Sequence, residues 1–196
     1  MFDDLIVELD PPTNRRDKCE GKERHLTEAA VMLAYGMHLL RTVPELRIVE
    51  LHPDGEHAKR FEIARWLLGQ GFVRENAFGT AAFAGTYICA DKSIVIASIP
   101  GRGDVVAVSQ GETIIAECKG GIVNTRHAGQ VSRLRRGLCE AVGLLMAREK
   151  GGRQIAVVPK TETTLKLAQR VAPRARDAGI EIVLVDERGR VFDVEP

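Results

Sequence analysis

Three residues in the middle of this sequence carry side chains that could act together in hydrolysis: Asp104, Glu117 and Lys119. Two neighbouring carboxylates repel each other, so one must hold a proton unless a cation neutralises them. Mg²⁺ takes oxygen ligands, often one or two carboxylates, and keeps several waters. A lysine beside such a site can stabilise developing negative charge or orient a water. The combination suits metal-dependent phosphodiester hydrolysis, and the competing interpretation is a surface hairpin with a single cross-strand salt bridge.

A predicted hairpin brings these three residues to one place. Residues 105–109 and 113–118 are rich in Val and Ile and flank Gln110-Gly111, which favours two strands joined by a two-residue loop. The register that follows from this loop puts Asp104 directly opposite Glu117. The lysine two positions after the glutamate shares its face, because side chains alternate along a strand.

The pattern G-D-x12-E-C-K on a strand–turn–strand unit resembles the signature of the PD-(D/E)XK nuclease superfamily. Pro100 lies four residues before the Asp rather than next to it, which departs from the usual pattern. The resemblance implies that Asp104 and Glu117 bind Mg²⁺, for which Mn²⁺ can substitute, with the backbone carbonyl of Cys118 as a further ligand. Lys119 would then activate or position water and stabilise the transition state.

The order of elements around the hairpin supports the resemblance. A helix with an apolar stripe from Val131 to Leu145 follows, and then a strand over 154–158, a helix over 162–178 and a strand over 181–185. Such a β-α-β crossover predicts parallel strands. This order is similar to that of Mrr-like (type IV) restriction endonuclease domains. The expected fold is therefore α/β, a restriction-endonuclease-like three-layer α-β-α sandwich with a mixed central sheet and an extra N-terminal helix.

The resemblance implies two further site residues. Members of the superfamily often carry a glutamine in the helix after the lysine, and Gln130 fits, either orienting Lys119 or its water or as an ordinary helix-surface amide. They also often carry an acidic residue on a preceding helix, here expected from Asp54 to Leu68. Glu56 lies at the edge of that helix's apolar stripe and Glu62 points away from it, which favours Glu56 as a metal ligand. A role for Glu56 at the helix dipole explains it equally well.

The chain divides into two parts in this interpretation. Residues 1–45 form an irregular lead-in and an accessory helix, and residues 46–196 form the nuclease domain. The helix has an apolar stripe from Leu26 to Leu40 that packs on the core or pairs two subunits. Because cutting both strands of a duplex usually calls for two active sites, we expect a homodimer.

Basic residues near the predicted site could bind a DNA backbone. The candidates are Arg102, Arg126, Arg133 and Arg136. Few acidic residues lie among the arginines of the helix that follows the hairpin, so these arginines could contact phosphates. Exposed helix faces are also often basic for solubility alone, and no base-reading motif is visible.

Composition limits the alternatives. The 196 residues are 44% hydrophobic and 28% charged with a net charge of +1, which is typical of a globular protein and gives no global attraction to nucleic acid. Four widely spaced cysteines favour reduced thiols, and no apolar run reaches the length of a membrane span. We therefore place the chain in the cytoplasm, away from membranes.

The sequence predicts a metal-dependent deoxyribonuclease, an endonuclease in defence or DNA processing. The alternative is a catalytically inactive nuclease-fold module that binds nucleic acid or an effector. The DNA form, sequence or modification recognised, the choice between DNA and RNA, and any targeting partner stay open at this point.

Overall fold

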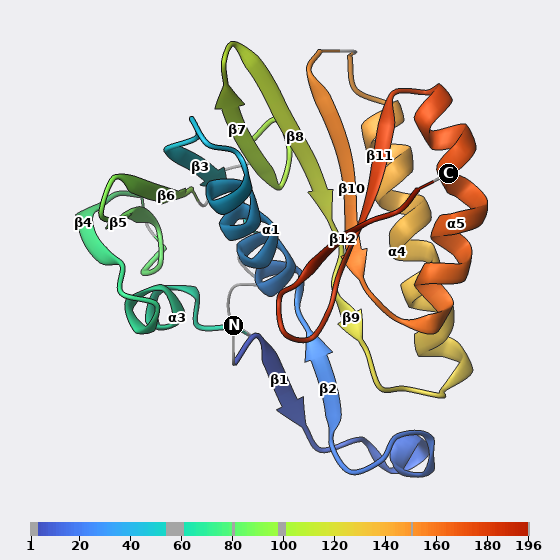
Figure 1. The fold of residues 1–196 in the computed structure, drawn as a ribbon. Helices are drawn as coiled ribbons and strands as arrows, with labels where there is room; N and C mark the ends of the chain where they lie inside the picture. The colour runs from blue at the N-terminus through green and yellow to red at the C-terminus, as the bar shows by residue number, and fades with distance from the viewer. Residues whose placement is uncertain (1–3, 54–60, 80, 98–100, 150, 196) are drawn as a thin grey trace.

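The computed structural model describes residues 4–53, 61–79, 81–97, 101–149 and 151–195, and Figure 1 shows their arrangement. The protein is a mixed α/β protein in which helices pack on a large mixed sheet of nine strands. A small antiparallel sheet of three strands lies beside it.

The strand order of the large sheet is β12-β11-β10-β8-β7-β3-β6-β5-β4, and that of the small sheet is β1-β2-β9. The strands are β1 (Ile6–Leu9), β2 (Glu23–Leu26), β3 (Ile48–Leu51), β4 (Val73–Ala77), β5 (Gly85–Cys89), β6 (Lys92–Ile96), β7 (Val105–Ser109), β8 (Glu112–Cys118), β9 (Gly121–Ile122), β10 (Arg153–Pro159), β11 (Ile180–Val185) and β12 (Val191–Asp193). The helices are the 3₁₀ helix η1 (Thr13–Lys18) and the α-helices α1 (Glu28–Thr42), α3 (Ile63–Gly69), α4 (Ala128–Met146) and α5 (Glu162–Asp177).

The predicted hairpin is present at the centre of the large sheet as β7 and β8. Its loop has positive φ at both central residues, 51° at Gln110 and 82° at Gly111, and this geometry matches the twist of the strands. Ser109 pairs with Glu112, as the two-residue loop predicts. The register of the hairpin, from the turn to the pair Val105 and Ala116, was therefore correctly predicted from local sequence.

Strand β8 separates two hydrophobic cores because its side chains alternate between the faces of the sheet. Ile114, Ala116 and Cys118 pack in the core that contains α1. Ile115 packs in the other core with α4 and α5. Helices thus cover both faces, α1 on one side and α4 with α5 on the other (Figure 1).

Helix α1 is not an accessory to the fold. Its residues from Glu28 to Met37 are all buried, and they pack on the strands at the centre of the sheet. Thr27 caps the helix, since its hydroxyl accepts a hydrogen bond from the Ala30 N–H. The apolar stripe of this helix lies in the core and is not available to pair two subunits. The homodimer stays a prediction, but α1 cannot supply its interface.

The C-terminal crossover matches its prediction. β10 pairs with β11 in parallel, with α5 between them in the chain. α5 begins with a capping box in which Thr161 accepts from the Thr164 N–H and Thr164 accepts from the Thr161 N–H. The connection follows the usual rule that parallel neighbours are joined through a helix.

Several sequence predictions were wrong or lie outside the described residues. The N-terminal residues expected to be irregular form β1, η1 and β2, whose strands pair as an antiparallel ladder. The strand that ends the chain, β12, and the edge strand β4 were not predicted. Of the helix expected over 54–68, residues 54–60 lie outside the described residues, and the described helix is α3.

In the part of the chain that the structure describes, no helix is both long and apolar enough to cross a membrane.

Candidate active site at the end of the β7–β8 hairpin

Asp104 lies where the hairpin ladder becomes irregular. Its N–H donates to the carbonyl of Ala116 at 2.9 Å, one residue out of step with the register of β7 and β8. Its carboxylate Oδ2 accepts the backbone N–H of Cys118 at 2.7 Å. Asp104 therefore contacts the backbone of Ala116 and of Cys118, the residues on either side of Glu117. It lies close to Glu117 but not directly opposite it, unlike in the predicted register.

The surroundings of Asp104 disfavour its charged form. Burial raises the pKa of Asp104 to about 7, the Cys118 N–H opposes this shift, and the neighbouring Glu117 and Glu28 carboxylates add to it. Lys119 lowers the pKa in turn, though by less than the other groups change it. Several like charges therefore crowd this end of the hairpin without full compensation from the protein.

Glu117 is almost fully buried, with a relative exposure of 3%. By strand alternation it shares the face of Ile115, which is covered by α4. The guanidinium of Arg148, just beyond the end of α4, forms an ion pair and hydrogen bond with its Oε1. Burying a carboxylate requires such a partner, because an unpaired buried charge is very costly.

Cys118 contributes its backbone rather than its thiol. The Lys119 N–H donates to the Val157 carbonyl of β10 at 3.0 Å, so the alternation of backbone groups turns the Cys118 N–H and C=O toward β7 and Asp104. The thiol points to the α1 face and is fully buried, and burial raises its pKa well above the usual value. Burial therefore disfavours the thiolate form of Cys118, while its carbonyl lies on the side of Asp104.

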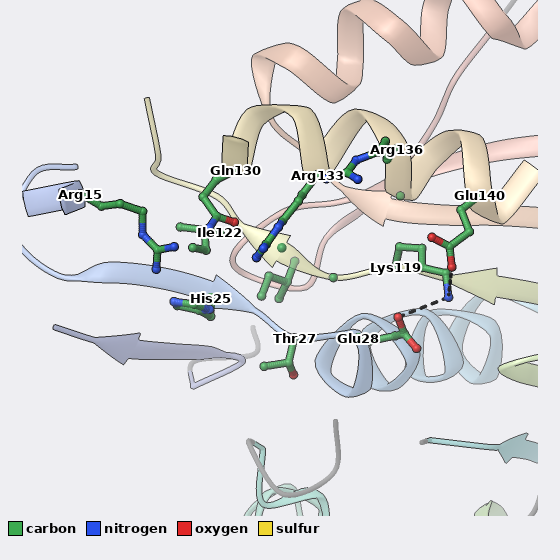
Figure 2. Close-up of a pocket in the computed structure, with 14 residues that line it drawn as sticks. Arg15, His25, Thr27, Glu28, Lys119, Ile122, Gln130, Arg133, Arg136 and Glu140 are labelled. Atoms are coloured by element: carbon green, nitrogen blue, oxygen red, sulfur yellow. Dashed lines mark hydrogen bonds and ion pairs between the residues drawn. The ribbon is translucent and has the colours of Figure 1, made fainter. Parts of the chain in front are cut away.

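Lys119 lies between two helices from opposite faces of the sheet. Its Nζ is 3.5 Å from Glu28 Oε2 of α1 and 3.5 Å from Glu140 Oε1 of α4 (Figure 2). Burial alone would lower the pKa of Lys119, but Glu28, Asp104 and Glu140 outweigh it and the pKa is raised. Lys119 is therefore a cation at neutral pH.

Glu28 is a site residue that sequence reasoning missed. It is buried at the first position of α1, where the positive end of the helix dipole favours a carboxylate. A Cβ on Gly120 would lie 2.4 Å from the Glu28 N and 2.6 Å from the Leu26 carbonyl, so only glycine allows the end of β8 to reach this helix. The available signal in the sequence was an acidic residue directly after a Thr cap.

Of the two glutamates considered for that role, the structure describes only Glu62. Glu56 lies outside the described residues. Glu62 precedes α3, is exposed, and pairs with Arg65 at 3.1 Å. Among the described residues, the helix acids beside Lys119 are Glu28 of α1 and Glu140 of α4, not Glu62.

Gln130 lies in the first turn of α4 and lines the same pocket as Lys119. The two side chains do not hydrogen bond within the described structure. Lys119 lies against Gly137, since a Cβ added to Gly137 would be 3.2 Å from the Cβ of Lys119. Because a helix rises 1.5 Å per residue, Gln130 lies about 10 Å from Gly137, toward the N-terminus of α4. The expectation that Gln130 orients Lys119 is therefore not met by a direct contact.

The four predicted DNA-binding arginines are dispersed. Arg102 is exposed in the turn before the hairpin. Arg126 is exposed and pairs with Glu20 at 3.1 Å. Arg133 and Arg136 are exposed on α4 and line the pocket beside Lys119. The structure thus brings two of the four to the candidate site.

No group of three or more His, Cys, Asp and Glu side chains within the described ranges is arranged to hold a metal ion. The two carboxylates of Asp104 and Glu117 and the Cys118 carbonyl nevertheless fit a hard divalent cation, which often takes only one or two carboxylates and fills the rest with water. Burial and the carboxylates of Glu117 and Glu28 raise the pKa of Asp104, and a bound cation would instead favour its charged form.

Comparison with known proteins adds no relative: the chain matches no protein-family model, no curated protein and no solved structure.

Proposed function

We propose that this protein is a Mg²⁺-dependent nuclease that hydrolyses phosphodiester bonds in DNA. The observation that supports it best is the convergence of Asp104, Glu117 and Lys119 at the end of one hairpin, with Glu28 added from α1. Buried charges of this kind weaken a fold, and such clusters with shifted pKa values are typical of active sites. The order of elements after the hairpin also supports a restriction-endonuclease-like α-β-α sandwich.

In the proposed mechanism Asp104, Glu117 and the Cys118 carbonyl would hold the metal ion, and Mn²⁺ could replace Mg²⁺. When bound there, the ion would supply an activated water and neutralise charge on the phosphate. Asp104 must lose its proton to bind the cation, so binding weakens at acidic pH. Glu28 lies next to Lys119 and completes the carboxylate cluster.

Lys119 acts as a fixed positive charge in this proposal. Its raised pKa keeps it protonated, so it is suited to stabilising the negative charge that develops on the phosphate and to positioning water. It is poorly suited to taking a proton from water. Of the roles that the sequence suggests for Lys119, we therefore propose the positioning of water and the stabilisation of charge, not the activation of water.

Substrate binding is assigned to Arg133 and Arg136 of α4, which line the pocket beside Lys119. Arg102 and Arg126 are exposed and could contact more distant phosphates.

The test is a cleavage assay with single-stranded DNA, duplex DNA, a branched junction and RNA, each with Mg²⁺ and with Mn²⁺. We expect cleavage of at least one DNA form, and loss of both metal binding and cleavage in Asp104→Ala. A wild-type protein that binds neither ion by calorimetry, and cuts none of these substrates, would contradict the proposal.

A catalytically inactive nuclease-fold module that binds nucleic acid or an effector is the second candidate. One observation favours it: the site residues already have protein partners. Arg148 pairs with Glu117, and Lys119 pairs with Glu28 and Glu140. A metal titration separates the two candidates, because an active site should take up Mg²⁺ or Mn²⁺ through the carboxylates whereas a pure binding module should not.

A further inference from the structure

A pocket of about 460 Å³ opens next to Lys119, between the small sheet and helix α4. Figure 2 shows its two walls: Arg15, His25 and Thr27 come from the N-terminal segment, and Gln130, Arg133 and Arg136 come from α4. The volume falls in the range of about 300–1,000 Å³ that is usual for small-molecule sites. The pocket is therefore suited to one small polar unit rather than to a duplex.

The charged groups of the pocket are not equally free to meet a ligand. Arg15 is held by the buried Glu23, with Nε 2.7 Å from Oε1, and Lys119 is held by Glu28 and Glu140. Arg133 and Arg136 make no ion pair with any residue that the structure describes. These two guanidinium groups, one helical turn apart, are suited to bind one phosphate group.

Gln130 adds a neutral polar group to the same pocket. Its relative exposure is only 7%, yet its side-chain amide has no hydrogen-bond partner among the described residues. Its side chain points from α4 toward Ile122, into the pocket (Figure 2). Its amide is not among the fully buried polar atoms without a partner in the described residues, so the amide atoms reach the pocket space and can meet a polar ligand there. An amide offers both donors and an acceptor.

We propose that this pocket binds a single nucleotide unit, with its phosphate on Arg133 and Arg136 and a polar edge of its nucleoside on Gln130. A phosphate alone would satisfy the arginines and leave the amide acceptor without a donor, whereas a nucleotide supplies both. The pocket adjoins Lys119, so an unpaired nucleotide bound here would place its strand next to the proposed cleavage site. This last step, and the choice of a strand as the source of the nucleotide, rest on the proposed function.

The nucleotide unit could come from a nucleic-acid strand or from a free mononucleotide. We assign it to a strand, because the pocket opens beside the proposed site of phosphodiester cleavage. The experiment uses a 5′-phosphorylated trinucleotide with a 3′ fluorophore, the full-length chain and EDTA, so that no metal-dependent cleavage can occur. Competition with dAMP and with inorganic phosphate measures what the pocket recognises.

We expect Arg133→Ala and Arg136→Ala each to weaken binding of the trinucleotide by about tenfold or more, the usual loss for a charge-assisted contact. Arg135→Ala is the matched control, because it removes the same charge from an exposed position of α4 that does not line the pocket. Its effect should stay under about twofold, as expected for one general charge. Equal losses in all three variants would overturn the proposal.

Gln130→Ala tests the second half of the assignment. It should weaken competition by dAMP about threefold or more and leave competition by inorganic phosphate unchanged, since a lost neutral hydrogen bond is weaker than a lost charged one. Inorganic phosphate that competes as well as dAMP on the wild-type protein would overturn a nucleotide site. A trinucleotide that binds more tightly than dAMP supports a strand as the source, whereas equal affinities reject the strand.

Failure of this inference is separable from failure of the nuclease proposal. Asp104→Ala should still bind the trinucleotide in EDTA, because Asp104 does not line the pocket. A protein that cleaves DNA with Mg²⁺ but shows no difference between Arg133→Ala and Arg135→Ala keeps its proposed activity and loses the nucleotide pocket.

Discussion

The C-terminal crossover and the end of the β7–β8 hairpin are both buried, but they are built by opposite rules. In the crossover, β10 and β11 bury almost only apolar side chains. Its fully buried Thr164 donates its hydroxyl to the Pro159 carbonyl and also completes the capping box of α5. The buried polar side chains of the crossover, Gln154 and Thr164, each donate to a backbone carbonyl five residues away in the chain.

The hairpin end instead buries carboxylates whose partners come from distant parts of the chain. Glu117 depends on Arg148, Lys119 on Glu28, and Asp104 has a pKa raised to about 7 by burial and its acidic neighbours. Proteins break the rules of local consistency mainly where function requires it. The contrast therefore supports the proposal of a site at the hairpin end, with the crossover as its support.

The largest effect should come from removing the positive charge at the site. Lys119→Ala should lower the cleavage rate by about a thousandfold or more, the usual loss when a group that stabilises the transition state is removed. Metal binding should survive, because an ammonium is not a metal ligand. Lys166→Ala on α5 removes an exposed lysine and should cleave normally. Cleavage at the wild-type rate in Lys119→Ala would show that the hairpin is structural.

The second effect concerns stability and pH without metal. Folded Asp104 keeps a proton up to about pH 7, whereas the unfolded chain releases it near pH 4, so the free energy of unfolding falls as pH rises through this window. Asp104→Asn removes that loss and should be more stable than wild type at pH 8, by on the order of 2–4 kcal/mol. The difference should vanish near pH 4, as measured by urea unfolding in EDTA. A variant that is less stable at pH 8 would contradict the burial of this charge.

A third prediction concerns the approach of β8 to α1. Gly120→Ala places a Cβ against the backbone of Leu26 and Glu28 and should destabilise the protein by about 1–3 kcal/mol. It should also impair cleavage, because it separates Lys119 from Glu28. Gly143→Ala is the control, since a Cβ there meets no atom within 4 Å and lies inside a helix. Thermal melting that ranks the two variants equally would argue against the close approach.

The smallest effect lies in the crossover. Thr161→Ala removes the cap of α5 and should cost about 1 kcal/mol of stability. Cleavage and metal binding should be unchanged after correction for folding, because this helix end belongs to the supporting region. A larger loss of cleavage than of stability would extend the site into the crossover.

The parts of the fold that sequence predicted are those with local causes. The Gln110-Gly111 turn fixed the register of the hairpin, and alternating and helical patterns located α4, β10, α5 and β11. Glu28 was missed because its place beside Lys119 depends on tertiary packing across 91 residues of chain. The strands β1 and β2 were missed because charged residues interrupt their pattern, and pairing with each other and with β9 decides their structure.

The position of β3 in the sheet has a consequence for how the protein folds. β3 lies between β6, which it pairs in parallel, and β7, which it pairs antiparallel, and both partners come more than 40 residues later in the sequence. Closing such long loops costs chain entropy before any contact forms, and topologies of this kind fold slowly. The hairpin and the crossover need only near neighbours, so we expect them to form first and β3 with α1 to dock afterwards. The acidic residues would then meet only in the last step of folding, when the repulsion between them is already outweighed by the packing of the rest of the chain.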